Sequence, residues 1–504
     1  MKRWILLSLL LLSSLLVSCA GTNRPAAPGV TTPDSRFSFT ILQMNDIYEL
    51  TPVSGGREGG LARVAAIRKE LLAENPNTIT MLAGDLFSPS ALGTAKVNGE
   101  KLAGRQIVDV MNTLGLDHIT FGNHEFDLDE KNFLARLAES RFAWVAANVF
   151  DRDMKPFPGV AANRVITLHD KAGRVLRLGL FGLTIAANQK EYVRYTEPLT
   201  AAREQVAALR DKVDVLVALT HLPLADDIAL AAAEPDIDLI IGGHEHENIE
   251  LRRGSDFVPV CKADANARTL YVHRISCDPA SKEVAVDSQL LRVTDALPED
   301  PETATAVARW QEIGFAAFRA EGLDPEEVVA SLPFALDGLE ASVRNRSTRL
   351  TAIIAAAYLE AVPDAELAFY NSGSVRVDDV LPPGPITQYD IIRILPFAGQ
   401  VCRAEMDGEL LTRMLDQGEA NRGNGGYLQS AGVSRDERGW LVNETPLEPT
   451  RTYKVATSDF LLSGREQNMG FFSTATPGLQ AACLEKSDIR LVLKEYLERH
   501  YPRP

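Results

Sequence analysis

Cysteine, basic charge and long apolar runs are all scarce in this sequence. It has five cysteines in 504 residues, and no two have the CxxC spacing of a zinc cage or a thioredoxin-type site. Acidic residues outnumber basic ones by 68 to 52, and the net charge of −16 argues against a nucleic-acid partner. The N-terminal apolar run, residues 4–17, is too short to span a bilayer comfortably. With 45% hydrophobic and 24% charged residues, the chain is neither disordered nor collagen-like and can form more than one core.

The N-terminus has the pattern of a targeting segment. Lys2 and Arg3 precede the apolar run, and Leu16-Val17-Ser18-Cys19 resembles the lipobox of bacterial lipoproteins. The resemblance implies a signal peptide over residues 1–18 and an acylated Cys19 that holds the protein on a membrane, facing the periplasm or the cell surface. Residues 19–37 are then a flexible tether. An ordinary signal peptide with an incidental cysteine is the alternative, and the choice between inner and outer membrane stays open.

The other cysteines are compatible with an oxidising compartment, which permits disulfides. Cys261 and Cys277 either face each other across a hairpin or remain buried thiols.

Apolar runs of strand length alternate with helix-period segments from Phe39 to His244. The predicted strands are 39–45, 78–83, 118–121, 144–148, 176–183, 213–219 and 237–241, followed by 258–262 and 269–276, and the predicted helices are 60–74, 105–114, 130–139 and 199–209. Such alternation predicts α/β layers with helices covering the sheet. We therefore expect an α/β domain over 38–295, a linker helix within 296–331, and a smaller domain of strands and helices over 332–504.

Polar side chains that can bind a metal or catalyse a reaction stand where the predicted strands end. They are Asp46, Asp85, Asn123, His124, His221, His244 and His246. Ligands of open α/β sheets bind outside the carboxyl ends of strands. Carboxylates, an amide oxygen and imidazoles form a donor set that suits a divalent transition metal. The pattern predicts a metal site at this edge.

The motifs that contain these residues resemble a known family. Asn45-Asp46, Gly84-Asp85, Gly122-Asn123-His124-Glu125-Phe126-Asp127, Thr220-His221 and Gly243-His244-Glu245-His246 resemble the ordered motifs of calcineurin-like metallophosphoesterases. Gly59-Gly60-Leu61-Ala62-Arg63 and the second half narrow the resemblance to the periplasmic or extracellular 5′-nucleotidases, over residues 38 to about 480. The family implies a layered αββα domain followed by a smaller α+β 5′-nucleotidase C-terminal domain.

The resemblance also implies roles for the residues. Asp85 would bridge two metal ions, Asp46 and His246 would bind one, and Asn123, His221 and His244 the other. The ions would be divalent or of mixed valence: manganese, zinc or iron. His124 would face charge that develops on the phosphoryl or leaving oxygen, oriented by Asp127. A helix cap is the alternative role for Asp127.

Tyr48 departs from the family's Asp-x-His pattern, because Asp46-Ile47-Tyr48 puts a phenol where an imidazole is expected. Tyr48 either binds the first metal as a phenolate or only packs beside it, in which case the metal has fewer protein ligands.

The second half is expected to hold the substrate. Asn371-Ser372-Gly373-Ser374-Val375-Arg376 and Val343-Arg344-Asn345-Arg346 resemble the family's arginine segments, so Arg344, Arg346 and Arg376 are candidate phosphate ligands. Phe397 and Phe460 resemble the phenylalanines that sandwich the base. The family's GGDGY run, which contributes to the nucleoside pocket, is replaced by Gly464-Arg465-Glu466-Gln467-Asn468. The resemblance therefore supports the catalytic identity better than it supports nucleotide specificity.

Together these features predict a membrane-anchored, metal-dependent phosphoric ester hydrolase that resembles a 5′-nucleotidase and acts on a small phosphorylated substrate, with no nucleic-acid partner. Two alternatives stay open at this point. One is a phosphatase or phosphodiesterase for a non-nucleotide ester, and the other is a nucleotide-binding lipoprotein without turnover. The retained His124 and Asp127 favour an enzyme.

Overall fold

The computed structural model describes residues 36–278 and 280–503, and two six-stranded sheets lie face to face in its first half. In the first sheet, with the order β16-β15-β1-β2-β5-β6, strands β1, β2, β5 and β6 run parallel. Its strands are β1 (Phe37–Met44), β2 (Thr78–Leu82), β5 (His118–Ile119), β6 (Ala143–Trp144), β15 (Thr269–Cys277) and β16 (Val284–Arg292). The second sheet has the order β13-β14-β12-β11-β9-β8, with four parallel strands in its middle. Its strands are β8 (Asn163–His169), β9 (Val175–Thr184), β11 (Val215–His221), β12 (Leu239–Gly242), β13 (Ile249–Arg253) and β14 (Val258–Lys262).

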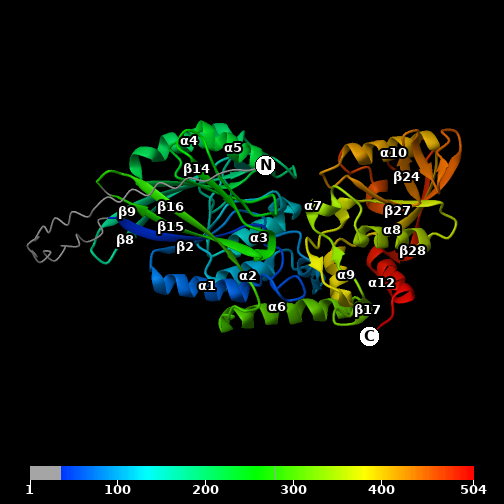
Figure 1. Cartoon of the computed structure of the whole chain (residues 1–504), viewed down its shortest axis with the longest axis horizontal. Helices are drawn as coiled ribbons and strands as arrows, with labels where there is room; N and C mark the ends of the chain where they lie inside the picture. Colours follow the sequence, from blue (N-terminus) through cyan, green and yellow to red (C-terminus); the bar gives the residue numbers. More distant parts are fainter. Residues whose placement is uncertain (1–35, 279, 504) are drawn as a thin grey trace, which may run out of the picture.

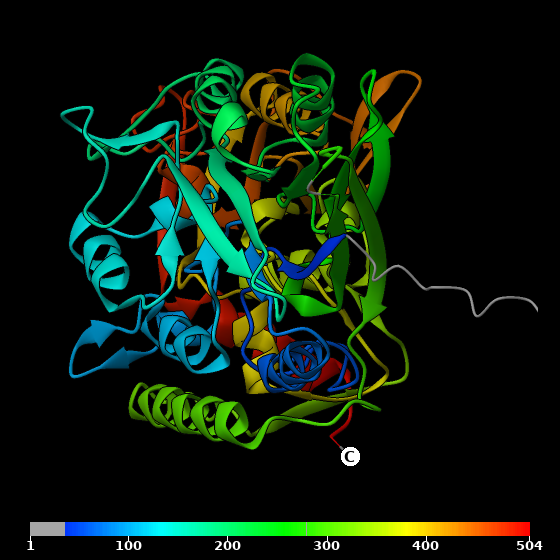
Figure 2. The ribbon, with the colours of Figure 1, turned by 90° about the vertical axis from the view of Figure 1, so that its left-hand side faces the viewer.

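Successive side chains of the central strands point to opposite faces of each sheet, and both faces are covered, which gives four layers. In β1, Phe39 and Ile41 pack in the core between the sheets, whereas Leu42 and Met44 pack in the core under the helices. A strand that is apolar on both faces needs a cover on each. Helices α1 (Leu61–Glu74), α2 (Arg105–Leu114) and α3 (Glu130–Glu139) cover the first sheet, and α6 (Pro301–Ala320) packs outside α1 and α2 on the same side. Helices α4 (Pro198–Leu209) and α5 (Leu224–Ala233) cover the second sheet. Figures 1 and 2 show these two groups on opposite sides of the sheets, which confirms the αββα prediction.

The sequence did not predict the edge strands β8, β13 and β16 or the helix α5. Strands β8 and β16, and the hairpin strand β13, alternate between exposed and partly buried residues instead of forming apolar runs. The predicted strands 118–121 and 144–148 are shorter in the structure, because only His118–Ile119 and Ala143–Trp144 form ladders. Two small ladders complete the first half: β3 (Lys96–Val97) with β4 (Glu100–Lys101), and β7 (Val149–Asp151) with β10 (Val193–Tyr195).

The second half is built around a five-stranded mixed sheet with the order β23-β19-β27-β22-β28. Its strands are β19 (Leu367–Asn371), β22 (Gln400–Asp407), β23 (Leu428–Ala431), β27 (Thr452–Ser458) and β28 (Gln480–Asp488). Helices α8 (Arg349–Ala361), α9 (Gln388–Ile394) and α12 (Ile489–His500) share one core with the sheet, and α10 (Gly408–Ala420) and α11 (Asp459–Leu462) share the other. Three of the four strand pairs in this sheet are antiparallel, so the second half is α+β, as the resemblance implied.

The connection between the halves runs through helix α6 and residues 321–327. Helix α6 packs on α1 and α2, so the connecting helix belongs structurally to the first half (Figure 1). Strand β17 (Val328–Leu332) then pairs with β21 (Gly384–Thr387), and it begins inside the range assigned to the linker. The remaining elements are β18 (Leu336–Asp337), α7 (Glu340–Val343), β20 (Val380–Leu381), β24 (Val433–Asp436), β25 (Gly439–Val442) and β26 (Thr445–Pro446).

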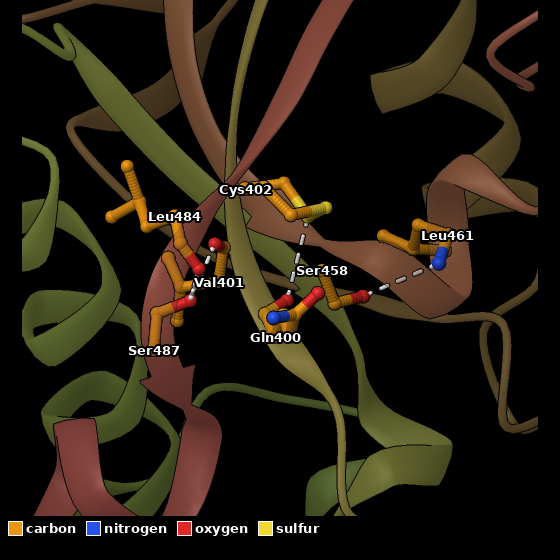
Figure 3. Close-up of a disulfide and its surroundings, with 8 residues drawn as sticks. Gln400, Val401, Cys402, Ser458, Leu461, Leu484 and Ser487 are labelled. Atoms are coloured by element: carbon orange, nitrogen blue, oxygen red, sulfur yellow. Dashed lines mark hydrogen bonds between the residues drawn. A yellow bond between two sulfur atoms is a disulfide. The ribbon is translucent and has the colours of Figure 1, made fainter.

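Cys402 and Cys483 form a disulfide, which the sequence reasoning did not assign. They face each other across β22 and β28, and Ser487 Oγ donates to Val401 O at 3.0 Å beside them (Figure 3). Cys261 and Cys277 are buried free thiols, because they lie on strands of different sheets and not across a hairpin.

The predicted signal peptide, Cys19 and most of the tether lie outside the described residues. Within residues 36–278 and 280–503, no helix has both the length and the apolarity that crossing a bilayer requires.

Candidate active site

The loops that follow five parallel strands converge at one edge of the two sheets. Asp46 follows β1, Asp85 follows β2, and Asn123 follows β5 in the first sheet. His221 ends β11 and His244 follows β12 in the second sheet. Because the sheets lie face to face, the carboxyl ends of both supply side chains to the same place.

Asp46, Asp85 and His221 lie at the centre of this cluster, with potential ligand atoms all within 4.8 Å of one another. His221 Nε2 is 3.3 Å from Asp85 Oδ2 and 3.2 Å from Asn123 Oδ1. His246 Nε2 is 3.3 Å from Asp46 Oδ1. These side chains are buried, and burying uncompensated carboxylates is costly unless a cation balances them. The donor set fits a divalent transition metal.

His244 lines the same site, with its ring centroid 5.2 Å from that of His221. Burial, assisted by the charge of His221 and opposed by Asp85, lowers the pKa of His244 to about 3. The imidazole is therefore neutral at physiological pH, the form in which histidine binds metals.

The backbone is strained where it presents these residues. Asp46, Asp85, His244 and His246 all have φ between 53° and 91°, a region that residues other than glycine rarely adopt. Strain of this kind persists only where the surroundings enforce it, and it gathers at functional sites. Gly122 is needed for a related reason, because a Cβ there would lie 2.1 Å from Asp85 Oδ1.

Glu125 holds two of these loops together, and the sequence reasoning gave it no role. Its carboxylate accepts from the backbone N–H groups of Asp85 at 3.1 Å and Gly122 at 2.6 Å. Burial, together with Asp85, raises the pKa of Glu125 to about 7. The contacts tie the loop after β2 to the loop after β5.

His124 and Asp127 form a hydrogen-bonded pair at the edge of the cluster. His124 Nδ1 is 2.7 Å from Asp127 Oδ2, and the backbone N–H of His124 donates to Asp85 Oδ1 at 2.8 Å. Asp127 also accepts from Ser88 Oγ at 2.9 Å and Asn188 Nδ2 at 2.8 Å. Burial lowers the pKa of His124, but Asp127 and Asp85 outweigh this effect and raise the pKa overall.

Asp127 does not have the alternative role of a helix cap, because the N-cap of α3 is Asp129.

Tyr48 lies inside the cluster. Its hydroxyl is 3.0 Å from Asp85 Oδ2, 3.2 Å from Asp46 Oδ1 and 3.0 Å from His246 Nε2. Burial raises the pKa of Tyr48 well above its ordinary value, and Asp85 and Asp46 add to the rise. The phenol therefore reaches the position of a ligand but holds its proton strongly.

A cavity of about 730 Å³ lies between the two halves and opens onto this cluster. The first half contributes the His124–Asp127 pair and part of the cluster, namely Asp85, Asn123, His244 and His246. The second half contributes Arg344, Arg376, Phe397 and Phe460, among other residues. Figure 1 shows the halves facing each other across this region, with α7 near the junction.

The candidate substrate residues differ in how free they are to bind. The buried Nε of Arg376 has no hydrogen-bond partner among the described residues. The guanidinium of Arg344 pairs with Glu340 at 2.5 Å. Arg346 does not line the cavity, because its guanidinium turns to Asp337 at 3.0 Å.

Phe397 and Phe460 are 42% and 38% exposed although both line the cavity. Exposed rings of this size in a pocket offer flat surfaces for stacking. The guanidinium of Arg376 lies over Phe397, 5.7 Å from the ring centroid, and Arg465 lies over Phe460 at 5.8 Å. Arg465 is one of the residues that replace the family's glycine-rich run.

Asn188, Glu340, Asp378 and Glu466 are further polar residues in or beside the cavity that sequence reasoning missed. None belongs to a motif at a strand end, so the pattern that found the metal cluster could not find them. Asp378 comes closest to having a signal, because it stands two residues after the segment that ends in Arg376.

Comparison with known proteins places this site in a family. The model of calcineurin-like phosphoesterases matches residues 39–248, and that of the 5′-nucleotidase C-terminal domain matches residues 328–474. These matches define a metal-dependent phosphoesterase. The chain belongs to the 5′-nucleotidase family of hydrolases, in which a calcineurin-like phosphoesterase domain precedes a 5′-nucleotidase C-terminal domain.

Among the curated relatives, a 5′-nucleotidase of Vibrio parahaemolyticus is 25% identical over 100% of this chain and 96% of its own. The trifunctional nucleotide phosphoesterase YfkN of Bacillus subtilis is 26% identical over 88% of this chain, which spans 33% of that longer protein. In structure, the chain is similar to a 5′-nucleotidase precursor of Thermus thermophilus, with a TM-score of 0.73 and 24% identity over 92% of this chain and 96% of that one. A Thermus sulfate thiohydrolase, SoxB, has a TM-score of 0.68 and 17% identity over 91% of this chain and 94% of its own, so the fold alone does not determine the substrate.

Proposed function

We propose that this phosphoesterase hydrolyses the phosphate ester of 5′-nucleotides, with two metal ions at the cluster of Asp46, Asp85, Asn123, His221, His244 and His246. The cavity is the main support for the proposal, because buried carboxylate and imidazole donors, an arginine nitrogen without a hydrogen-bond partner among the described residues and two exposed aromatic rings all line it. Manganese, zinc and iron all suit these donors. Bound there, two cations would polarise the phosphoryl oxygens and lower the pKa of a water molecule.

The chain's own residues supply orientation and charge. Asp127 accepts from His124 Nδ1 and so turns the other ring nitrogen toward the cavity, where it can donate to the phosphoryl or leaving oxygen. Arg376 has a free Nε beside this pair and can bind the phosphate. Phe397 and Phe460 can stack on the nucleotide base.

Two further parts of the proposal rest on the sequence. Acylation at Cys19 would anchor the enzyme to a bacterial membrane on the periplasmic side or at the cell surface. Residues 38–295 would form the catalytic domain and residues 332–504 the substrate domain, joined by 296–331.

Kinetics on the metal-reconstituted enzyme test the substrate. Nucleoside 5′-monophosphates, sugar phosphates, cyclic nucleotides and an aryl phosphate are compared for kcat/KM, and we expect the nucleoside monophosphates to be preferred. Arg376→Ala should mainly raise KM, while Arg438→Ala, at an exposed turn, should change nothing. Equal kcat/KM for nucleotides and the aryl phosphate would contradict recognition by the second half.

A further inference from the structure

Asp378 belongs to the second half but reaches the metal cluster of the first. It lies between Arg376 and β20, and its backbone has φ of 37°. Its Oδ2 is 3.1 Å from His246 Nδ1, and its Oδ1 accepts from the backbone N–H of Glu340 at 2.8 Å. Arg268, from the first half, donates to Oδ2 at 3.5 Å. The carboxylate is buried at the junction of the two halves.

The two ring nitrogens of His246 face opposite partners. Nδ1 faces Asp378, whereas Nε2 faces Asp46 Oδ1 at 3.3 Å and the Tyr48 hydroxyl at 3.0 Å. An ionised carboxylate can only accept a hydrogen bond, so it favours the tautomer with its hydrogen on Nδ1. That tautomer leaves the lone pair of Nε2 directed at the cluster, as a metal ligand requires.

We propose that Asp378 is a positioning residue for metal binding: the second half supplies the carboxylate that orients His246 and fixes its tautomer. A carboxylate behind a histidine ligand also makes the imidazole a stronger donor. The inference rests on the proposed function, because it takes His246 as a metal ligand. It adds that the metal site in the first half is complete only when the second half is in place.

The neighbouring Asp379 provides a matched control. It is also buried and also bridges the halves, accepting from the Ser54 N–H at 2.9 Å and from Arg393 Nη2 at 3.1 Å. None of its described hydrogen bonds or ion pairs involves a residue of the metal cluster. Substitution of Asp379 therefore tests the contact between the halves alone. Substitution of Asp378 tests that contact and also the hydrogen bond to His246.

The experiment titrates Mn²⁺ into metal-stripped, full-length protein and follows the heat of binding. Asn tolerates positive φ, so Asp378→Asn suits the backbone. Since the Glu340 N–H needs the amide oxygen, the NH₂ group must face His246 Nδ1, which moves the hydrogen of the ring to Nε2. We expect one of two Mn²⁺ ions to bind about 10- to 100-fold more weakly. Asp379→Asn should bind Mn²⁺ as the wild type does.

Kinetics separate positioning from a purely structural role. For Asp378→Asn, kcat should fall at stoichiometric Mn²⁺ and recover at excess Mn²⁺, with KM unchanged. If Asp378→Asn does not fold, as judged by thermal unfolding, Asp378→Gly removes the carboxylate at a φ that glycine adopts freely and should show the same loss.

The outcomes are distinct. Wild-type affinity for Mn²⁺ in the folded Asp378 variant, or equal losses in the Asp378 and Asp379 variants, would overturn the inference. A wild-type protein that neither binds Mn²⁺ nor hydrolyses phosphate esters would instead overturn the proposed function.

Discussion

His124 lies between two carboxylates that have different tasks. Asp127 holds its side chain, and Asp85, a proposed metal ligand, holds its backbone N–H. We predict that His124→Asn lowers kcat by about two to four orders of magnitude, the usual effect of losing a positioned catalytic group. Metal content, measured by elemental analysis, should stay at the wild-type level because the side chain is not a proposed ligand. Turnover within about tenfold of the wild type would contradict the assigned role.

Tyr48 allows a second test within the cluster. Metal binding to a phenol must displace its proton, which burial and the two aspartates make difficult. We predict that Tyr48→His tightens the first metal site, because it restores the family's ligand set, and that Tyr48→Phe leaves two metals bound. Calorimetric titration and elemental analysis measure both.

The phenolate alternative for Tyr48 has its own signature. A hard anionic oxygen favours iron, and an iron phenolate absorbs visible light. A coloured wild-type protein that Tyr48→Phe bleaches would therefore show that Tyr48 is a ligand.

Residues within motifs were predictable, and those that support them were not. Asp85, His221 and His244 each stand where a predicted strand ends, so topology brings them together. Asp378 and Asn188 reach the site through loops, and no periodic pattern marks a residue that acts through a neighbour. Arg346 shows the converse case, since the resemblance made it a candidate phosphate ligand, whereas in the structure its guanidinium pairs with Asp337 outside the cavity lining.

Lys262, the last residue of β14, ties three elements together behind the site. Its buried ammonium donates to Leu222 O, next to His221 at the end of β11, at 2.6 Å, and to Gly243 O, before His244, at 2.8 Å. It also pairs with Asp227 on α5 at 2.8 Å and with Glu245. One cation thus joins both loops that present histidines from the second sheet.

We predict that Lys262→Met lowers the free energy of unfolding by about 3–5 kcal/mol, because it leaves buried charges without a partner. Urea denaturation followed by circular dichroism measures this loss. Lys131→Met, which removes an exposed pair with Glu100, should change stability little. Equal effects of the two substitutions would contradict the importance of the buried cluster.

Most buried strands could be predicted closely, whereas the edge strands β8, β13 and β16 could not. Residues 258–262 were predicted as a strand and form β14, because a short apolar run bounded by polar residues is typical of a buried strand. Strand β16 alternates exposed and partly buried residues, a weaker signal, and its pairing with β15 depends on the rest of the sheet.

The two halves meet through buried polar contacts that no local pattern could predict. Arg393 of the second half lies 3.3 Å from Glu49 of the first, and Ser54 Oγ donates to Asp379 at 3.0 Å although 325 positions separate the residues. The change of pattern near residue 295 indicated two parts, but the way they face each other depends on pairs this far apart.

The N-terminal anchor concerns the entire protein and can be tested apart from catalysis. Cys19→Ala should release the enzyme from membranes without changing kcat/KM, because the tether contains none of the motifs. Partitioning between detergent and aqueous phases measures the first effect, and a standard phosphatase assay the second. An unchanged membrane fraction would count against lipidation.

The polypeptide passes from the first half to the second once, through α6 and residues 321–327. Gly322, with φ of 83°, would meet no neighbouring atom within 4 Å if it carried a Cβ. One genetic crossover at this point would exchange the complete second half. Asp378 would be inherited with Arg376 and the cavity phenylalanines, and separately from His246. A lineage that recombined here would change its substrate contacts and the setting of its metal site in a single event.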